Sequence, residues 1–156
     1  VKARVKSINA SGVPVISDTP DIANARIEFD NGAVANLTAS RVSLKKMRKA
    51  RFFQSNGYIS VDFLDKKVEA FRLSDGDISN SPFSFEIDPK NNGEKKILSF
   101  ESPAVPEVNA IKYELELFAK SIIDDVAPSV TLEDGFHSLE VAHQILEKIE
   151  LTNAKF

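Results

Sequence analysis

The stretch IANARIEFDNGAVANLTA, residues 22–39, has the pattern of two β-strands joined by a hairpin turn. In both halves apolar and polar side chains alternate, which is the period of a half-buried strand. The central Asp30-Asn31-Gly32 supplies residues that tolerate the positive φ of a tight turn. In the first strand, one face carries Ala23, Ala25, Ile27 and Phe29, and the other carries Asn24, Arg26 and Glu28. We therefore predict an antiparallel pair with one apolar and one polar face.

The same pattern recurs over the first two thirds of the chain. An alternating edge strand is expected at residues 1–8, and further strands at 51–54, 58–64, 68–73, 83–87 and 96–100. Turn residues separate them at Asn56-Gly57, at 65–67, at Asp75-Gly76-Asp77 and at Asn91-Asn92-Gly93. Strands joined by hairpin turns predict a largely antiparallel, open-faced sheet.

The last third changes to a helical period. Val108, Ile111, Leu115, Phe118 and Ile122 recur at spacings of three and four, between Pro106 and Pro128. Thr131 is the predicted N-cap of a second helix, whose inner face is formed by Leu132, Phe136, Leu139, Ala142, Leu146 and Ile149. Strands followed by helices predict an α+β domain, in which both helices pack on one face of the sheet.

The composition of the chain excludes several classes of function. The chain has 156 residues, which suits one domain spanning 1–156, and a net charge of −3, which argues against a generally basic nucleic-acid binder. It has no cysteine, so disulfides, thiolate metal sites and cysteine nucleophiles are excluded. No apolar run approaches the ~20 residues of a membrane span, and no secretory signal is visible. The expected compartment is the cytoplasm.

The motif search excludes several chemistries. Glycines at 12, 32, 57, 76, 93 and 135 fit neither a dinucleotide nor a triphosphate loop, and no hydrolase nucleophile motif occurs. His137 is predicted on the charged face of the second helix and His143 at the edge of its apolar stripe, so neither indicates a metal or catalytic site. Asp18 and Asp21 in SDTPD are typical of a turn that leads into a strand.

One stretch is strongly basic, although the chain as a whole has a negative net charge. RVSLKKMRKAR, residues 41–51, holds six cations and no acid: Arg41, Lys45, Lys46, Arg48, Lys49 and Arg51. Such a stretch can hold phosphate or carboxylate groups, whether of nucleic acid or of a small anion, although it lacks the interleaved aromatic residues of a single-strand binder. A solvated connection between two strands explains it equally well.

Three stretches, in order, resemble one enzyme family. GVPVISDTPDIANARIEFDNGAVANLTASR, RKARFFQSNGYISVDFLDKKVE and NAIKYELELFAKSIIDDVAPSVTLEDGFHSLEVAHQILEKI are similar to the C-terminal domain of the glucose–fructose oxidoreductase and inositol dehydrogenase family (Gfo/Idh/MocA). The resemblance implies a two-domain NAD(P)-dependent oxidoreductase acting on a sugar, sugar derivative or polyol. A separate N-terminal Rossmann domain would hold the NAD or NADP.

The resemblance assigns no catalytic or cofactor-binding residue to these 156 residues. The family's Glu-Lys-Pro lysine and its Asp-x-x-x-His histidine have no counterpart here, so residues 1–156 alone are expected to be inactive. Arg41, Lys45 and Arg48 are the candidate substrate contacts, and a homo-oligomer through the exposed sheet face is the expected assembly. The alternative is a free-standing module that binds an anionic ligand or nucleic acid through residues 41–51.

Overall fold

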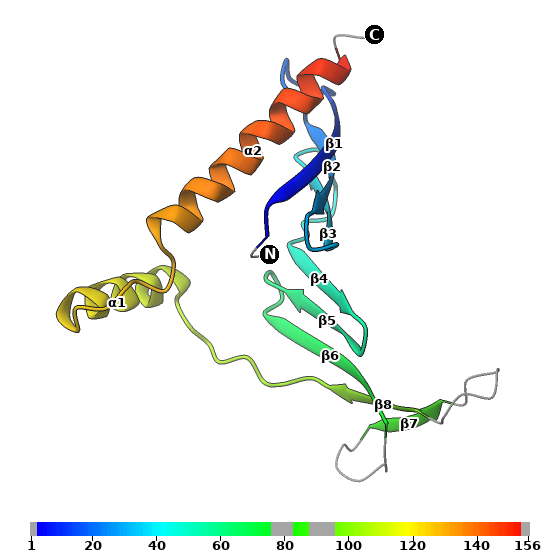
Figure 1. Cartoon of the computed structure of the whole chain (residues 1–156), viewed down its shortest axis with the longest axis vertical. Coiled ribbons are helices and arrows are strands. Elements are labelled where there is room, and N and C mark those ends of the chain that lie inside the picture. Colours follow the sequence, from blue (N-terminus) through cyan, green and yellow to red (C-terminus); the bar gives the residue numbers. More distant parts are fainter. Residues whose placement is uncertain (1–2, 76–82, 88–95, 154–156) are drawn as a thin grey trace. The chain divides into compact units, whose positions relative to one another are not determined.

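The computed structural model describes residues 3–75, 83–87 and 96–153 (Figure 1). These residues contain eight strands and two helices, in which all the strands come before the helices. The chain divides into two units, one of residues 1–44 and 110–156 and the other of residues 45–109. Each unit contains one antiparallel sheet.

The first unit contains a three-stranded sheet. Its strands are β1 (Val5–Val13), β2 (Ile22–Phe29) and β3 (Val34–Ser40), in the order β1-β2-β3. The predicted hairpin is confirmed: β2 and β3 pair antiparallel, Gly32 has a φ of 84°, and the Phe29 amide donates to the Ala33 carbonyl over 2.9 Å. The predicted edge strand exists, but its limits at residues 1–8 were wrong. β1 continues to Val13 because its small residues, up to Gly12, pair with β2.

Helix α2 (Leu132–Asn153) packs on β1 from one face of this sheet (Figure 1). Ile149 is 1% exposed, and a Cβ placed on Gly12 would lie 2.8 Å from its Cγ2, so the absence of a side chain at Gly12 allows the close approach. Thr152 Oγ1 donates to the Ala10 carbonyl over 3.3 Å. Ile8, Ala25 and Ile27 are the other buried apolar residues of this unit. A small core between one helix and one sheet face therefore organises it.

The helices form as predicted but bury less of their apolar faces. Helix α1 spans Ala110–Ile123, and Thr131 caps α2 by accepting a hydrogen bond from the Asp134 amide over 3.2 Å. Both helices were expected to lie with their apolar stripes on the sheet. Instead Leu115 and Phe118 of α1, and Phe136 and Leu139 of α2, are exposed. Of the predicted inner face of α2, only Ile149 is fully buried, and the main contact of α2 with the sheet is with β1.

The second unit contains a five-stranded antiparallel sheet. Its strands are β4 (Lys49–Gln54), β5 (Gly57–Asp62), β6 (Lys67–Ser74), β7 (Ser84–Ile87) and β8 (Lys96–Glu101), in the order β4-β5-β6-β8-β7. The turn residues predicted at 76–77 and 91–93 lie outside the described residues. One face carries a row of rings from Phe53 through Tyr58 and Phe71 to Phe100, with centroid separations of 4.9, 5.6 and 4.9 Å. Cross-strand aromatic pairs of this kind stabilise a sheet directly.

The α+β class with open antiparallel sheets is confirmed. The strands form two sheets, because the pairing stops after β3 and resumes at β4, and the cationic stretch contains the break. Helical residues that the structure describes include no segment long and apolar enough to cross a membrane.

Candidate functional site

Asp21 lies at the end of the loop that connects β1 to β2, and its side chain holds this loop. Its side chain is buried, and Oδ2 accepts hydrogen bonds from the backbone amides of Val15, Ile16 and Ser17 over 2.8, 2.8 and 3.0 Å. These bonds, led by that from Ile16, hold the pKa of Asp21 well below its usual range, although burial acts in the opposite direction. The carboxylate therefore fixes the loop formed by residues 14–20.

Arg41 completes the same arrangement. One guanidinium nitrogen, Nη2, lies 3.0 Å from Asp21 Oδ1 and donates to Ser17 Oγ, Thr19 Oγ1 and the Pro20 carbonyl over 3.0, 2.9 and 3.1 Å. The Arg41 amide also donates to the Asp21 carbonyl over 2.8 Å. The Arg41 side chain is about half exposed and ties the end of β3 to this loop. A substrate contact by Arg41 stays a prediction. Arg41 also holds the 14–20 loop, so an experiment on Arg41 has to distinguish substrate binding from this structural role.

Lys45 and Arg48, the other two predicted contacts, belong to the second unit, so no described contact brings them together with Arg41. Both are exposed, and within the described part of the chain neither has an ion-pair partner within 4 Å. Lys46 and Arg51 are also exposed, and neither has an ion-pair partner within 4 Å among the described residues. The segment from Lys45 to Arg51 therefore presents four uncompensated cations to solvent.

Lys49 is the exception in that segment. Its Nζ lies 2.8 Å from Asp62 Oδ2, and this hydrogen bond raises the pKa of Lys49 and lowers that of Asp62. Asp62 Oδ1 also accepts the amides of Leu64 and Asp65, both over 3.0 Å. The pair joins β4 to the turn after β5, so Lys49 stabilises the sheet and is not a free ligand contact.

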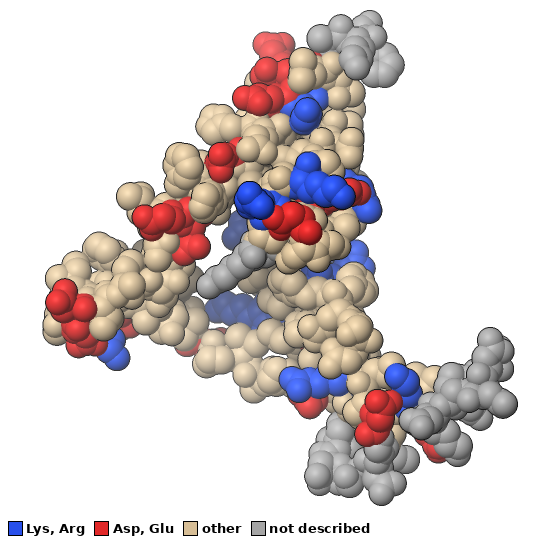
Figure 2. All heavy atoms as spheres, viewed as in Figure 1, with Lys and Arg blue, Asp and Glu red and all other residues tan. Residues whose placement is uncertain are grey.

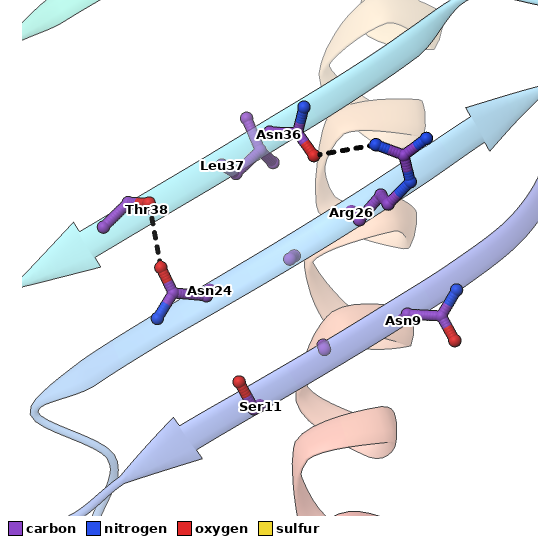
Figure 3. A pocket seen from close by; sticks show the side chains of 9 residues that line it. Asn9, Ser11, Asn24, Arg26, Asn36, Leu37 and Thr38 are labelled. Atoms are coloured by element: carbon purple, nitrogen blue, oxygen red, sulfur yellow. Dashed lines mark hydrogen bonds between the residues drawn. The ribbon is translucent and has the colours of Figure 1, made fainter.

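A polar hollow of about 390 Å³ lies on the β1–β3 sheet, and Figure 3 shows its polar side chains on the side away from α2. Thr38 Oγ1 donates to Asn24 Oδ1 over 2.9 Å, and Arg26 Nη1 donates to Asn36 Oδ1 over 3.3 Å. The lining residues are Asn9, Ala10, Ser11, Asn24, Ala25, Arg26, Asn36, Leu37 and Thr38. This hollow was not predicted from the sequence. Its signal was the repeated tripeptide Asn-Ala-Ser, Asn-Ala-Arg and Asn-Leu-Thr, one in each strand.

The free face of this sheet, where a homo-oligomer contact was expected, is polar. Asn24 and Arg26 occupy it, as the alternation of β2 predicted, while Ala25 and Ile27 are buried. The exposed apolar surface of the sheets is instead concentrated in the second unit, where Phe52, Phe53 and Phe85 are all more than half exposed.

No group of three or more His, Asp or Glu in the described residues is placed to hold a metal ion. His137 is exposed and lies 3.4 Å from Glu140, as expected for a residue on the charged face of α2. Figure 2 shows acidic side chains gathered along α2. The described glycines lie in β1, in the hairpin turn, in β5 and in α2, and none of them forms a loop that could cradle a dinucleotide pyrophosphate.

The fold and the site define an α+β domain with a polar sheet face, an anchored loop and a cationic strand connection. No family model matches the chain. It is 37% identical over 75 residues to the UDP-N-acetylglucosamine 3-dehydrogenase of Acidithiobacillus ferrooxidans, and this alignment covers 48% of the chain and 24% of that enzyme. A solved structure of the same enzyme superposes with a TM-score of 0.78 at 27% identity, covering 96% of the chain and 43% of the enzyme.

Two further structures share the fold. An NAD-binding protein from Listeria innocua has a TM-score of 0.65 at 18% identity over 97% of this chain and 45% of its own. Levoglucosan dehydrogenase, in complex with NADH and L-sorbose, has a TM-score of 0.70 at 15% identity over 94% and 43%. The chain thus spans less than half the length of these relatives, which include dehydrogenases of the class that the sequence resemblance implies.

Proposed function

We propose that residues 1–156 form the C-terminal domain of an NAD(P)-dependent oxidoreductase that acts on a nucleotide sugar. The superposition on a UDP-N-acetylglucosamine 3-dehydrogenase over almost the whole chain carries this proposal, because it comes with detectable sequence identity. The order of the three family-like stretches supports it. In this assignment the domain shapes the sugar site and contributes subunit contacts, while another domain performs hydride transfer.

The cofactor would be held outside these residues. A dinucleotide needs a glycine loop that opens a helix, where backbone amides meet the pyrophosphate. The described glycines do not fit that role, so no step of the reaction is assigned to a cofactor bound by this chain. The part of the relatives that this chain does not cover, more than half of their length, leaves room for a Rossmann domain.

The candidate substrate contacts are Arg41, Lys45 and Arg48. A nucleotide sugar carries a diphosphate, and guanidinium and ammonium groups provide charge-assisted hydrogen bonds to phosphate oxygens. Lys45 and Arg48 are the more direct candidates because they have no acidic partner among the described residues, whereas Arg41 already holds the 14–20 loop. Arg41 would then act by positioning the end of β3.

Kinetics of the complete protein tests this proposal. Lys45→Ala and Arg48→Ala should each lower kcat/KM for UDP-N-acetylglucosamine about ten- to a hundredfold, and should have little effect on a neutral sugar. Lys120→Ala, an exposed lysine on α1, is the matched control. Values of kcat/KM that match the wild type for both variants would remove these residues from the site.

The alternative is a free-standing module that binds an anion or nucleic acid through residues 41–51, and the four uncompensated cations favour it. Its affinity for an oligonucleotide should fall steeply as salt rises, because each neutralised phosphate releases counterions. Salt-dependent oligonucleotide binding without binding of NADH or NADPH by the complete protein would favour this alternative over the oxidoreductase.

Subunit contacts form the last part of the proposal. We place them on a sheet face that no helix of its own unit covers, which gives a homo-oligomer. Light scattering of the complete protein tests this, since a monomer at all concentrations would contradict it.

A further inference from the structure

The aromatic row of the second sheet crosses all of its strands. Strand register aligns five rings, in the order Phe53, Tyr58, Phe71, Phe100 and Phe83. Neighbouring ring centroids lie 4.9, 5.6, 4.9 and 6.5 Å apart. The three inner rings are flanked on both sides and are only partly exposed, whereas the two end rings are 75% and 60% exposed. The row therefore ends in an open ring on either side of the sheet.

Phe53 is the open ring at the β4 end of the row. The Tyr58 ring lies beside it at a centroid distance of 4.9 Å and an inclination of 30°, so one face of the Phe53 ring is covered. β4 is the first strand in the order of this sheet and pairs with β5 alone, so no strand of the sheet covers the other face. Flat aromatic groups stack in offset arrangements at such distances. A further flat ring can thus extend the row at Phe53.

A free cation lies beside this open ring. Alternation along β4 puts the Arg51 side chain on the same face of the sheet as Phe53, about 7 Å away along the strand. Glu69 is in register with Arg51 two strands away, but its carboxylate pairs with Lys67. Arg51 itself is exposed, and among the described residues it has no ion-pair partner within 4 Å. An aromatic surface and an unneutralised guanidinium are therefore neighbours on one strand.

We propose that Phe53 stacks on the nucleobase of the nucleotide sugar and that Arg51 binds the adjacent phosphate. This rests on the proposed function and specifies which residues hold the nucleotide. Nucleobases stack on aromatic side chains, and a guanidinium forms charge-assisted hydrogen bonds to phosphate oxygens. The order of the groups also agrees. The base lies at Phe53 and the first phosphate at Arg51, so the second phosphate is directed towards Arg48 and Lys45, which precede β4.

The opposite face of β4 lacks this combination, although it also carries an open ring. Phe52 is 56% exposed, but its partners in register, Ile59 and Ala70, are aliphatic and extend no aromatic row. The residues two positions away on its own strand are Ala50 and Gln54, and neither is charged. Phe52 therefore provides the matched control, because it is a similarly exposed phenylalanine on the same strand.

Calorimetry of the complete protein, saturated with NADH, tests the proposal with UDP and with inorganic pyrophosphate, which lacks the base. Phe53→Ala should weaken UDP binding about five- to a hundredfold, the usual effect of losing one stacked base, and should leave pyrophosphate binding unchanged. Arg51→Ala should weaken the binding of both ligands. Phe53→Tyr keeps the ring and should bind UDP as the wild type does. Phe52→Ala should bind both ligands normally.

Several results would overturn the proposal once circular dichroism has shown that the variants are folded. These are a wild type that does not bind UDP, an unchanged UDP affinity in Phe53→Ala, and an equal loss in Phe52→Ala. An equal loss of UDP and pyrophosphate binding in Phe53→Ala would also overturn it, because the base would then have no part in the contact. So would a changed sedimentation coefficient with unchanged UDP binding, which would assign Phe53 to a protein contact.

The proposed function can fail separately from this inference. UDP binding that depends on Phe53, without reduction of NAD⁺ or NADP⁺ by any nucleotide sugar, would contradict the oxidoreductase assignment alone. Turnover of UDP-N-acetylglucosamine, with a UDP affinity that is the same in Phe53→Ala as in the wild type, would contradict the stacking site alone.

Discussion

The two sheets of this chain are stabilised in different ways. In the three-stranded sheet the core forms against a helix: Gly12 allows α2 to approach closely, and Ile149 of α2 is buried together with Ile8, Ala25 and Ile27 of the strands. The five-stranded sheet belongs to a unit whose described elements are strands alone, and rings on neighbouring strands contact one another along one of its faces. Similar hairpin signals in the sequence thus lead to one sheet that depends on a helix and one that depends on cross-strand pairs.

The largest expected effect is at the contact between helix and sheet. Ile149→Ala should lower the free energy of unfolding by about 2–5 kcal/mol, because it removes a buried side chain and leaves a cavity against β1. Urea denaturation of the complete protein measures this. Glu150→Ala, the exposed neighbour on α2, should stay within about 0.5 kcal/mol of the wild type. A cost at Ile149 no larger than that at Glu150 would show that α2 does not organise the first sheet.

Gly12→Val changes the β1 side of the same contact between helix and sheet. A Cβ there lies 2.8 Å from Ile149 Cγ2 and 3.0 Å from Pro20 Cβ, so the added side chain should cost about 1–3 kcal/mol by overpacking. Combining it with Ile149→Ala should cost less than the sum of the single changes, since the cavity accepts the new methyl groups. Strict additivity in the double-mutant cycle would argue against direct contact between the two residues.

The second sheet should respond to changes in its aromatic row. Phe71 stacks between Tyr58 and Phe100, so Phe71→Leu should cost about 0.5–1.5 kcal/mol beyond the effect of lost area. Phe85→Leu, at an exposed position of the same sheet, is the control for the change in area. Equal destabilisation by both substitutions would show that contacts between the rings add no stability beyond the buried area.

The smallest effect concerns the anchored loop and depends on pH. Folding lowers the pKa of Asp21 below its ordinary value of 3.8, so the carboxylate stabilises the folded chain above that pH and ceases to do so as the pH falls further. Asp21→Asn should therefore be less stable than the wild type at pH 7, and the difference should narrow below about pH 4. Urea midpoints at both pH values measure this. A difference that is constant with pH would mean that the charge of Asp21 is not what holds the loop.

The sequence predicted most elements but not how they assemble. The alternation of residues 22–39 and the turn at Asp30-Asn31-Gly32 were sufficient for the first hairpin, because local backbone preferences decide it. The extension of β1 to Val13 was missed because Asn9 to Gly12 have low strand propensity, and pairing with β2 compensates for it. The break between the sheets depends on long-range hydrogen bonds, which periodicity does not report.

For the candidate site, too, the sequence identified residues but not the partners that they contact. The six cations of residues 41–51 were visible as a charge anomaly, but the sequence did not indicate that Arg41 binds Asp21 or that Lys49 pairs with Asp62. Both partners lie on other elements. The polar side chains that line the hollow on the β1–β3 sheet were missed because residues in register there, such as Asn9 and Asn36, are up to 27 positions apart along the chain and come together only through strand pairing.

The most direct test of the central claim is reduction of NAD⁺ or NADP⁺ by the complete protein in the presence of UDP-N-acetylglucosamine, followed by the absorbance of the reduced nicotinamide. N-acetylglucosamine without the nucleotide is the control that separates recognition of the diphosphate from recognition of the sugar. The account predicts turnover of the nucleotide sugar, with little or none of the free sugar, and a lower kcat/KM in Arg48→Ala. If neither nicotinamide cofactor binds to the folded protein or is reduced by it with any nucleotide sugar, the assignment as an oxidoreductase domain is contradicted.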